Sequence, residues 1–386
     1  MSNKPIYLDY LATTPIAPEV RDAMMSCLDE SGDFGNPASR THVYGWQAEH
    51  RVEVARGAVA DLIGADPREI IFTSGATEAN NLAIKGVFEA LNFSGHFVTS
   101  AIEHKAVLDP ANYLQRKGVG VSFLPATKEG LVDIGALERS LRADTRLVSI
   151  MWVNNELGTI NPIKEIGQLL KSKGVLLHVD AAQAAGKLLI DLADVSIDLL
   201  SLSAHKFYGP KGIGALFVRK GVTPAPVAQV HGGGHERGFR SGTLPTHQIA
   251  GFGAAARLAE ERWDKDQSHY DRLGRYMTQR LLDIEGATLN GSLKTRLPQA
   301  ANVSFNGVEG EALLSALVGI AISSGSACNS SVMKPSHVLL GIGAGRARAD
   351  SALRFSLGRA TTREDIDIAI DELVTTLKML RGNPLD

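Results

Sequence analysis

The chain has 386 residues, 44% of them hydrophobic and 21% charged, which is typical of a globular protein with about two or three domains. The formal net charge is −2, so no basic field is available for a phosphate backbone, and we expect no direct nucleic-acid partner. The N-terminus lacks the basic and apolar stretches of a signal peptide, and no run approaches the ~20 apolar residues of a membrane span. We therefore expect a cytoplasmic protein without a membrane partner.

Apolar runs of strand length alternate with helical patterns from about residue 66 to 218. This alternation is typical of βα units and predicts a mostly parallel sheet flanked by helices. Beyond about Gly251 a long charged helix is expected over 252–282, followed by shorter units that indicate a second, smaller α/β domain. The predicted strands are 70–72, 96–100, 121–124, 147–153, 176–180, 199–203 and 215–218.

The run Ser203-Ala204-His205-Lys206 ends one predicted strand and precedes a turn rich in Gly and Pro. A lysine at the edge of a buried sheet can be partly desolvated, which makes its amine a nucleophile for a carbonyl group. A surface lysine in a turn is the simpler interpretation of this motif alone. The residues at the other predicted strand ends decide between a nucleophilic lysine and a surface lysine.

The strand that ends near Phe72 leads through Ser74-Gly75-Ala76-Thr77 into a helix. Backbone N–H groups at a helix start, with the Thr77 hydroxyl, can form a cradle for a phosphate group. The small residues of this turn allow a ligand to approach it closely. A simple helix cap is the alternative.

Three further strand ends carry polar residues. His104 can stack on an aromatic ligand or move protons, although a lone histidine is more often a capping or packing residue. Asn154 and Asn155 can bind a ligand or shape a turn. Asp180 ends a buried strand, where a carboxylate needs a cationic partner such as a protonated pyridine nitrogen or an arginine. Asp180 and Lys206 follow successive strands and can converge at the carboxyl edge of the sheet.

These strand ends offer a phosphate cradle, a stacking ring, an acid for a ring nitrogen and an amine for an aldehyde. Pyridoxal phosphate needs all four in one molecule. The order of the motifs therefore predicts a pyridoxal-phosphate site.

A set of short motifs covers nearly the whole chain, namely 7–10, 35–39, 74–78, 103–105, 154–156, 204–206, 232–236, 240–243 and 323–328. Together they resemble the cysteine desulfurases of the class-V aminotransferase family, pyridoxal-phosphate enzymes of fold type I, and most of all the type that supplies sulfur for iron–sulfur cluster assembly. The resemblance implies a large cofactor-binding domain over 16–260. Residues 1–15 and 261–386 would form the small domain.

By this resemblance Lys206 binds the cofactor covalently, Asp180 pairs with the pyridine nitrogen and His104 stacks on the ring. Gln183 and Asn155 are similar to residues that contact the ring hydroxyl and the substrate. The positions that match phosphate-binding residues are Ala76, Thr77, Ser203 and His205.

Two further positions follow from the same resemblance. Thr243 is similar to a residue that reaches the phosphate from the partner subunit, which implies a homodimer with shared active sites. Arg354 is similar to the arginine that grips the substrate carboxylate, a bidentate task that suits a guanidinium group.

The two cysteines lie too far apart in sequence to indicate a disulfide framework or a metal site, and we predict no metal. Cys328 lies in the small, polar stretch 323–331, where we expect an exposed and mobile thiol. Cys27, on a predicted helix among apolar neighbours, is expected to be structural.

The expected reaction is removal of sulfur from L-cysteine, which gives L-alanine and a persulfide on Cys328. Lys206 would take the α-proton and His104 would exchange a proton at the substrate thiol. The sulfur would pass to an acceptor protein for cluster assembly or for another sulfur-containing product.

The sequence departs from the family pattern at Leu11, Trp152 and Asn329, and it ends at Asp386 without the longer tail that helps relatives dock a scaffold protein. A different acceptor is therefore an open alternative. Another pyridoxal-phosphate lyase, such as a selenocysteine lyase, and a sulfur-delivery module without catalysis are the competing functional interpretations.

Overall fold

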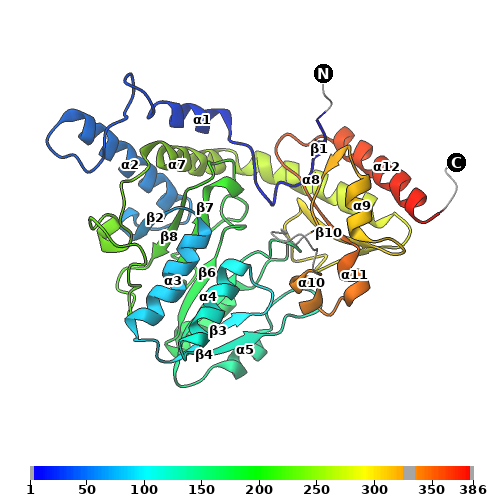
Figure 1. The fold of residues 1–386 in the computed structure, drawn as a ribbon, viewed down its shortest axis with the longest axis horizontal. Coiled ribbons are helices and arrows are strands. Elements are labelled where there is room, and N and C mark those ends of the chain that lie inside the picture. Colours follow the sequence, from blue (N-terminus) through cyan, green and yellow to red (C-terminus); the bar gives the residue numbers. More distant parts are fainter. Residues whose placement is uncertain (1–3, 325–334, 383–386) are drawn as a thin grey trace.

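The computed structural model describes residues 4–324 and 335–382, and its largest element is a seven-stranded sheet (Figure 1). Strand β8 is antiparallel to both of its neighbours, and the remaining pairs are parallel. In spatial order the strands are β2 (Ile70–Thr73), β8 (Gly214–Val218), β7 (Leu199–Ser203), β6 (Leu176–Asp180), β5 (Thr145–Met151), β3 (His96–Ser100) and β4 (Gly120–Leu124). The predicted mostly parallel α/β sheet is confirmed.

The register of the central strands aligns their carboxyl ends. Met151 of β5 lies opposite Asp180 of β6, and Asp180 lies opposite Ser201 of β7. Residues that follow these strands therefore meet at one edge of the sheet, which is where open α/β folds bind ligands.

Helices cover both faces of the large sheet (Figure 1). Leu82 and Val107 pack in the core of one face, whereas Ile166 and Phe252 belong to the core of the other. Helix α6 ends at Gly174, whose φ of +66° is a left-handed conformation that suits glycine. These helices are α1 (Pro18–Met25), α2 (Val43–Asp61), α3 (Ala76–Ala90), α4 (Lys105–Arg116), α5 (Ile134–Ser140), α6 (Ile163–Lys173) and α7 (Thr246–Glu261).

A second hydrophobic core lies beside the first and contains Leu273, Phe305, Phe355 and Leu373 (Figure 1). It is built on an antiparallel sheet of order β12-β10-β9 and a parallel pair of β1 with β11. The elements of this core are β1 (Ile6–Tyr7), α8 (Trp263–Leu282), β9 (Ala287–Leu289), β10 (Ala300–Phe305), α9 (Gly310–Ala316), β11 (Ile320–Ala321), β12 (Ala352–Ser356) and α12 (Arg363–Leu380). Helices α10 (His337–Gly341) and α11 (Arg346–Asp350) pack in a smaller hydrophobic cluster with Ile102 and Leu157.

The single helix predicted over 252–282 is wrong, because α7 ends at Glu261 and α8 begins at Trp263. Arg262 between them has φ −99° and ψ 2°. The break lets α7 bury Phe252 in the large core while α8 buries Met277 in the second core. The sequence pattern shows the apolar periodicity but not this change of partner.

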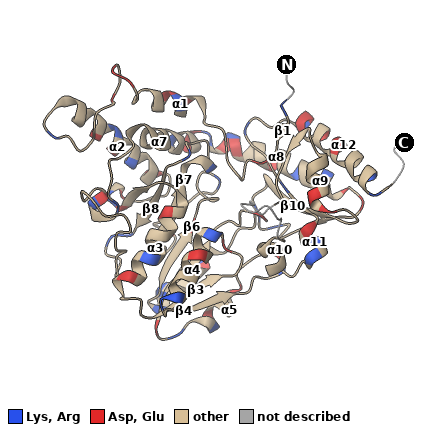
Figure 2. Cartoon of the chain, in the orientation of Figure 1, with Lys and Arg blue, Asp and Glu red and all other residues tan. Residues whose placement is uncertain are grey.

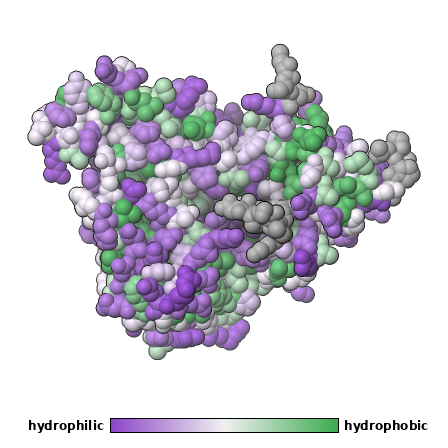
Figure 3. Space-filling model, viewed as in Figure 1, coloured by the Kyte–Doolittle hydropathy of each residue, from purple (hydrophilic) through white to green (hydrophobic). Residues whose placement is uncertain are grey.

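The surface is chemically mixed. Figure 2 shows acidic and basic residues interspersed along the helices, and Figure 3 shows hydrophilic residues over much of the same face with smaller hydrophobic areas. Ile368 and Met379 of α12, for example, remain about half exposed, at 49% and 53%. Within residues 4–324 and 335–382, no helix is long and apolar enough to span a bilayer.

Candidate active site

The carboxyl ends of β2, β5, β6 and β7 surround a cavity of about 430 Å³. Nine of the residues predicted for the site line it, so the structure brings most of that set together. These nine are Ala76, Thr77, His104, Asn155, Asp180, Gln183, Ser203, His205 and Lys206.

Lys206 ends a short 3-10 turn, Ala204–Lys206, that directly follows β7. Its Nζ donates hydrogen bonds to the carbonyl oxygens of Leu11 at 2.9 Å and Ala12 at 2.8 Å. Burial, with a smaller contribution from the positive charge of Arg354, lowers the pKa of Lys206 to about 8, and Asp180 and Asp9 oppose the shift. A large fraction of this amine is therefore neutral near pH 8.

Asp180 is the last residue of β6 and is buried. Its Oδ2 accepts from Nδ2 of Asn80 at 2.7 Å, and its Oδ1 accepts from the backbone N–H of Ala182 at 3.0 Å. Both donors are neutral, so neither hydrogen bond places a positive charge beside the carboxylate, and it can pair with a cationic ligand atom in the cavity. Asn80 was not predicted, because an asparagine within a helix carries no sequence signal of this contact.

His104 is the N-cap of α4, and its Nδ1 accepts from the backbone N–H of Ala106 at 3.1 Å. The ring borders the cavity, and removal of bulk water by the surrounding protein lowers its pKa, with Asp180 opposing the shift. A neutral ring that uses Nδ1 as acceptor carries its proton on Nε2. The histidine thus both caps a helix and borders the cavity.

Glu103, the neighbour of His104, was not predicted as a site residue. It is fully buried, its Oε1 accepts from the backbone N–H of Met151 at 3.0 Å, and burial raises its pKa well above the usual range. Burial therefore favours the neutral form of this carboxyl group beside Asp180.

The junction of β2 and α3 forms the predicted cradle. Gly75 precedes the helix with φ +151° and ψ 178°, and Ala76 and Thr77 begin it, where backbone N–H groups have no partner within the helix. A side chain at Gly214 would lie 2.7 Å from Cα of Gly75, so this approach of strand and loop requires glycine. Gly75, Ala76 and Thr77 line the cavity.

His205 also lines the cavity. Its Nδ1 is 3.1 Å from Oγ1 of Thr13, and burial, with Lys206 and Lys211 adding to it, lowers the pKa of His205 to about 4. The ring is therefore neutral at pH 7 and can offer a phosphate a hydrogen bond but no charge.

Gln183 links the cavity to the N-terminal segment and to a buried amine. Its Nε2 donates to the carbonyl oxygen of Leu11 at 2.8 Å, and its Oε1 accepts from Nζ of Lys187 at 2.7 Å. Burial lowers the pKa of Lys187 well below its usual value. Lys187 was not predicted, since a lysine in an apolar helical turn gives no hint of burial.

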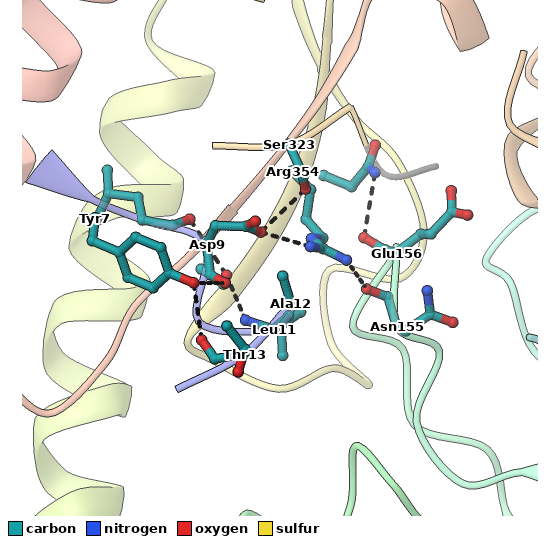
Figure 4. Close-up of polar contacts among 12 residues, drawn as sticks. Tyr7, Asp9, Leu11, Ala12, Thr13, Asn155, Glu156, Ser323 and Arg354 are labelled. Atoms are coloured by element: carbon teal, nitrogen blue, oxygen red, sulfur yellow. Dashed lines mark hydrogen bonds and ion pairs between the residues drawn. The ribbon is translucent and has the colours of Figure 1, made fainter. Parts of the chain in front are cut away.

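Arg354 of β12 does not line the cavity but is joined to it (Figure 4). Its Nη1 donates to the carbonyl oxygen of Asn155 at 2.8 Å, and its Nη2 pairs with Oδ1 of Asp9 at 2.6 Å. The side chain of Asn154, by contrast, is buried and its Oδ1 accepts the N–H groups of the following turn. Of the two amides, Asn155 therefore borders the cavity and Asn154 shapes the turn.

Three remaining predictions have different outcomes. Thr243 is exposed and outside the cavity lining of its own chain. Cys328 falls outside the described residues. Cys27 is buried as predicted, although α1 ends two residues before it, and burial raises the pKa of its thiol.

A family model described as aminotransferase class-V matches residues 6–368. The chain belongs to this family. It is 53% identical over 378 residues to a protein named cysteine desulfurase IscS from Proteus mirabilis, a match that covers 98% of this chain and 94% of that protein. A cysteine desulfurase IscS from Vibrio cholerae is also 53% identical, over 379 residues with the same coverage of each chain.

Solved structures give the same relationship for this class-V chain. A NifS-like protein superposes with a TM-score of 0.90 at 37% identity and covers 97% of this chain and 100% of its own. A structure titled SspA in complex with cysteine has a TM-score of 0.81 at 39% identity and covers 91% and 98%. The predicted family and fold are therefore confirmed.

Class-V aminotransferases and cysteine desulfurases depend on pyridoxal phosphate, and the donor set of this class-V site fits that group. The amine of Lys206 is partly neutral, the Asp180 carboxylate has no charged partner among its hydrogen bonds, and the helix start at Ala76 offers N–H groups for a phosphate. The amine, the carboxylate and the cradle line one cavity.

The segment 7–13 is the main part of the site that sequence reasoning did not assign a role. Its backbone carbonyls at Leu11 and Ala12 hold Lys206, and its Asp9 holds Arg354. The sequence signal is weak, because the carbonyl groups exist at every residue. The acid Asp9 directly after apolar Tyr7-Leu8 was the one visible clue.

Proposed function

We propose that the protein is a pyridoxal-phosphate-dependent cysteine desulfurase, which converts L-cysteine to L-alanine and retains the sulfur as a persulfide on Cys328. The observation that carries the proposal is the convergence of the Lys206 amine, the Asp180 carboxylate and the His104 ring on one cavity. The 53% identity to proteins named cysteine desulfurase supports this choice among pyridoxal-phosphate reactions.

Four groups would hold the cofactor. Lys206 would bind its aldehyde carbon, Asp180 its ring nitrogen and His104 the face of its ring, while the start of α3 at Ala76 would hold the phosphate with Thr77, Ser203 and His205. Gln183 would contact the ring hydroxyl. Bound there, the cofactor supplies an electron-accepting ring that stabilises the electron pair left on the α-carbon of the substrate.

Lys206 acts as the base that removes the α-proton of the substrate. Its pKa of about 8 leaves a substantial neutral fraction at the pH of a cell interior, which a base requires. The carbonyl oxygens of Leu11 and Ala12 accept hydrogen bonds from the free amine, so they keep Nζ in the cavity when it is not bonded to the cofactor.

His104 handles the proton of the substrate thiol. Its lowered pKa keeps the ring neutral at pH 7, and its Nδ1 is occupied by the N–H of Ala106. Nε2 therefore carries the proton of the neutral ring and is the atom that can donate a hydrogen bond to the substrate sulfur. Arg354 and Asn155 orient the substrate, with the guanidinium group of Arg354 facing the carboxylate.

Cys328 takes the sulfur. Its thiolate attacks the sulfur of the substrate, so that an S–S bond forms as the C–S bond breaks and the electron pair of that bond goes to the three-carbon product. With the protons returned, one L-cysteine and one enzyme thiol give one L-alanine and one persulfide. The persulfide sulfur then passes to an acceptor protein for iron–sulfur cluster assembly or another sulfur-containing product.

The test is to incubate the purified holoenzyme with L-cysteine and dithiothreitol and to measure alanine and sulfide. We expect the two in equal amounts. Cys328→Ser should keep the visible absorbance of the bound cofactor and lose sulfide release, while Cys27→Ser, the matched change at the buried cysteine, should keep both. Full sulfide release by Cys328→Ser would refute the persulfide step.

We also propose a homodimer with shared active sites, in which Thr243 contacts the cofactor phosphate of the partner subunit. Its exposed position away from the cavity of its own chain supports this arrangement.

A further inference from the structure

The guanidinium group of Arg354 is held from two sides in a site with little solvent (Figure 4). Nη2 lies 2.6 Å from Oδ1 of Asp9, Nη1 lies 2.8 Å from the carbonyl oxygen of Asn155, and the arginine side chain is only 7% exposed. A guanidinium group has five N–H donors in a fixed plane. Two protein acceptors therefore fix the plane and leave the other donors, among them the unpartnered Nε, in a set direction.

Asp9 is itself held in place. Oγ of Ser323 donates to its Oδ1 at 3.1 Å, and the hydroxyl of Tyr7 donates to its backbone oxygen at 3.1 Å and to that of Thr13 at 3.0 Å. Asp9 also bridges in parallel with Ser356, two residues beyond Arg354 on β12. The acid and the arginine are thus fixed to the same strand, and Asp9 cannot swing away without breaking several contacts.

We propose that Asp9 is a positioning residue for substrate binding, which orients Arg354 so that its remaining N–H groups meet the carboxylate of L-cysteine. This inference rests on the proposed function. A planar fork binds a carboxylate well only when both are aligned, and an arginine that is free to rotate loses that alignment. Asp9 bonds Arg354 directly and acts on Lys206 only through its charge, so its main effect is expected on substrate affinity, with a smaller effect on the chemical step.

The experiment compares Asp9→Ala and Asp9→Asn holoenzymes with the natural protein. Because only the carboxylate contact is weakened, we expect KM for L-cysteine to rise about tenfold in Asp9→Ala while kcat changes less than about twofold. Asp9→Asn keeps an acceptor oxygen and should raise KM only about threefold. The inhibition constant of 2-aminoethanethiol, which is L-cysteine without its carboxyl group, should stay within about twofold in both variants.

The buried pair of Arg359 and Asp266 gives a matched control. It has the same 2.6 Å separation and similar exposure, but lies outside the cavity lining. Asp266→Ala should lower the melting temperature as Asp9→Ala does and leave KM for L-cysteine unchanged.

An unchanged KM in a folded Asp9→Ala enzyme would overturn the inference, as would an equal loss of affinity for L-cysteine and 2-aminoethanethiol. If Asp9→Ala does not fold, Asp9→Asn decides by the same comparison. Absence of alanine and sulfide from the natural protein would instead refute the proposed function, so the two failures are distinguishable.

Discussion

Lys206 obtains its reactivity from its place at the end of β7. Burial lowers the pKa of its amine to about 8, and the charge of Arg354 acts in the same direction, whereas Asp180 and Asp9 act in the opposite one. Only the neutral amine attacks an aldehyde. An exposed lysine with a pKa near 10.4 would be almost wholly protonated at neutral pH.

The first prediction concerns the pH dependence of cofactor uptake. The neutral fraction of the Lys206 amine grows as pH rises, so the rate at which the cofactor-free protein takes up pyridoxal phosphate should rise as well. Because the pKa of Lys206 is lowered in the folded protein, the midpoint should lie near pH 8. Arg354→Gln removes a charge that lowers this pKa and should move the midpoint up. Asp180→Asn should move it down. Visible absorbance measures the uptake. A midpoint that is the same in both variants as in the natural protein would contradict this account.

Residue types at strand ends were predictable, but their immediate partners were not. Asp180, Lys206 and His104 follow apolar runs whose periodicity marks them. Asn80 comes from a segment distant from Asp180, and the contacts of Lys206 are backbone carbonyl groups of residues 11 and 12. Lys187 is close to Gln183 in sequence, but its burial is not visible there. Only the folded chain reveals these partners.

At the scale of elements, a buried ion pair ties the loop before Thr243 to the large sheet. Nη1 and Nη2 of Arg56 on α2 donate hydrogen bonds to the Glu236 carboxylate, at 2.8 and 2.7 Å. The same carboxylate also accepts from the backbone N–H of Phe72 on β2 at 2.6 Å. The side chains are 4% and 1% exposed. Glu236 is therefore fixed to both α2 and β2.

The second prediction tests this pair. Glu236→Ala leaves the buried Arg56 with only the exposed Glu53 as an acidic partner, so the free energy of unfolding should fall by about 3–5 kcal/mol. Adding Arg56→Met should recover part of that loss. Urea denaturation measures both, and Asp271→Ala, which breaks an exposed pair with Arg275, should cost less than about 1 kcal/mol. A loss for Glu236→Ala as small as that for Asp271→Ala would contradict the prediction.

Strands were more predictable than the joints between elements. The predicted strands 96–100, 176–180 and 199–203 match the structure in full. The strand predicted over 147–153 ends at Met151, because Val153 pairs with Ile160 instead, and the predicted helix breaks at Arg262. In both cases the local pattern continues while the tertiary partner changes, and a local pattern does not contain that partner.

At the scale of the molecule, we propose that 16–260 form a large domain and that 1–15 with 261–386 form a small one. Most of the large core comes from residues before Arg262 and most of the second core from residues after it, which supports this division, while Leu297 and Ala300 pack in the large core. The third prediction is that native-state hydrogen exchange protects β6 and β10 with different opening free energies, because each core can open without the other. A single value for both strands would argue for one cooperative unit.

The fourth prediction tests the shared active sites. Lys206→Ala should be inactive, and Thr243→Asp should repel the cofactor phosphate of the partner. Unfolding and refolding an equal mixture should give heterodimers with one complete site each, and thus about a quarter of the natural activity. A mixture no more active than its components would place Thr243 outside the partner's site.

The short stretch 9–12 contacts both side chains that we propose to bind the two ends of an α-amino acid, namely Lys206 and Arg354. Its backbone carbonyls set where the Lys206 amine rests, and its one acid sets where the Arg354 fork points. This one stretch therefore fixes where the amine and the guanidinium group lie relative to each other. A β-amino acid, which is longer by one methylene, should fail to fit both groups at once.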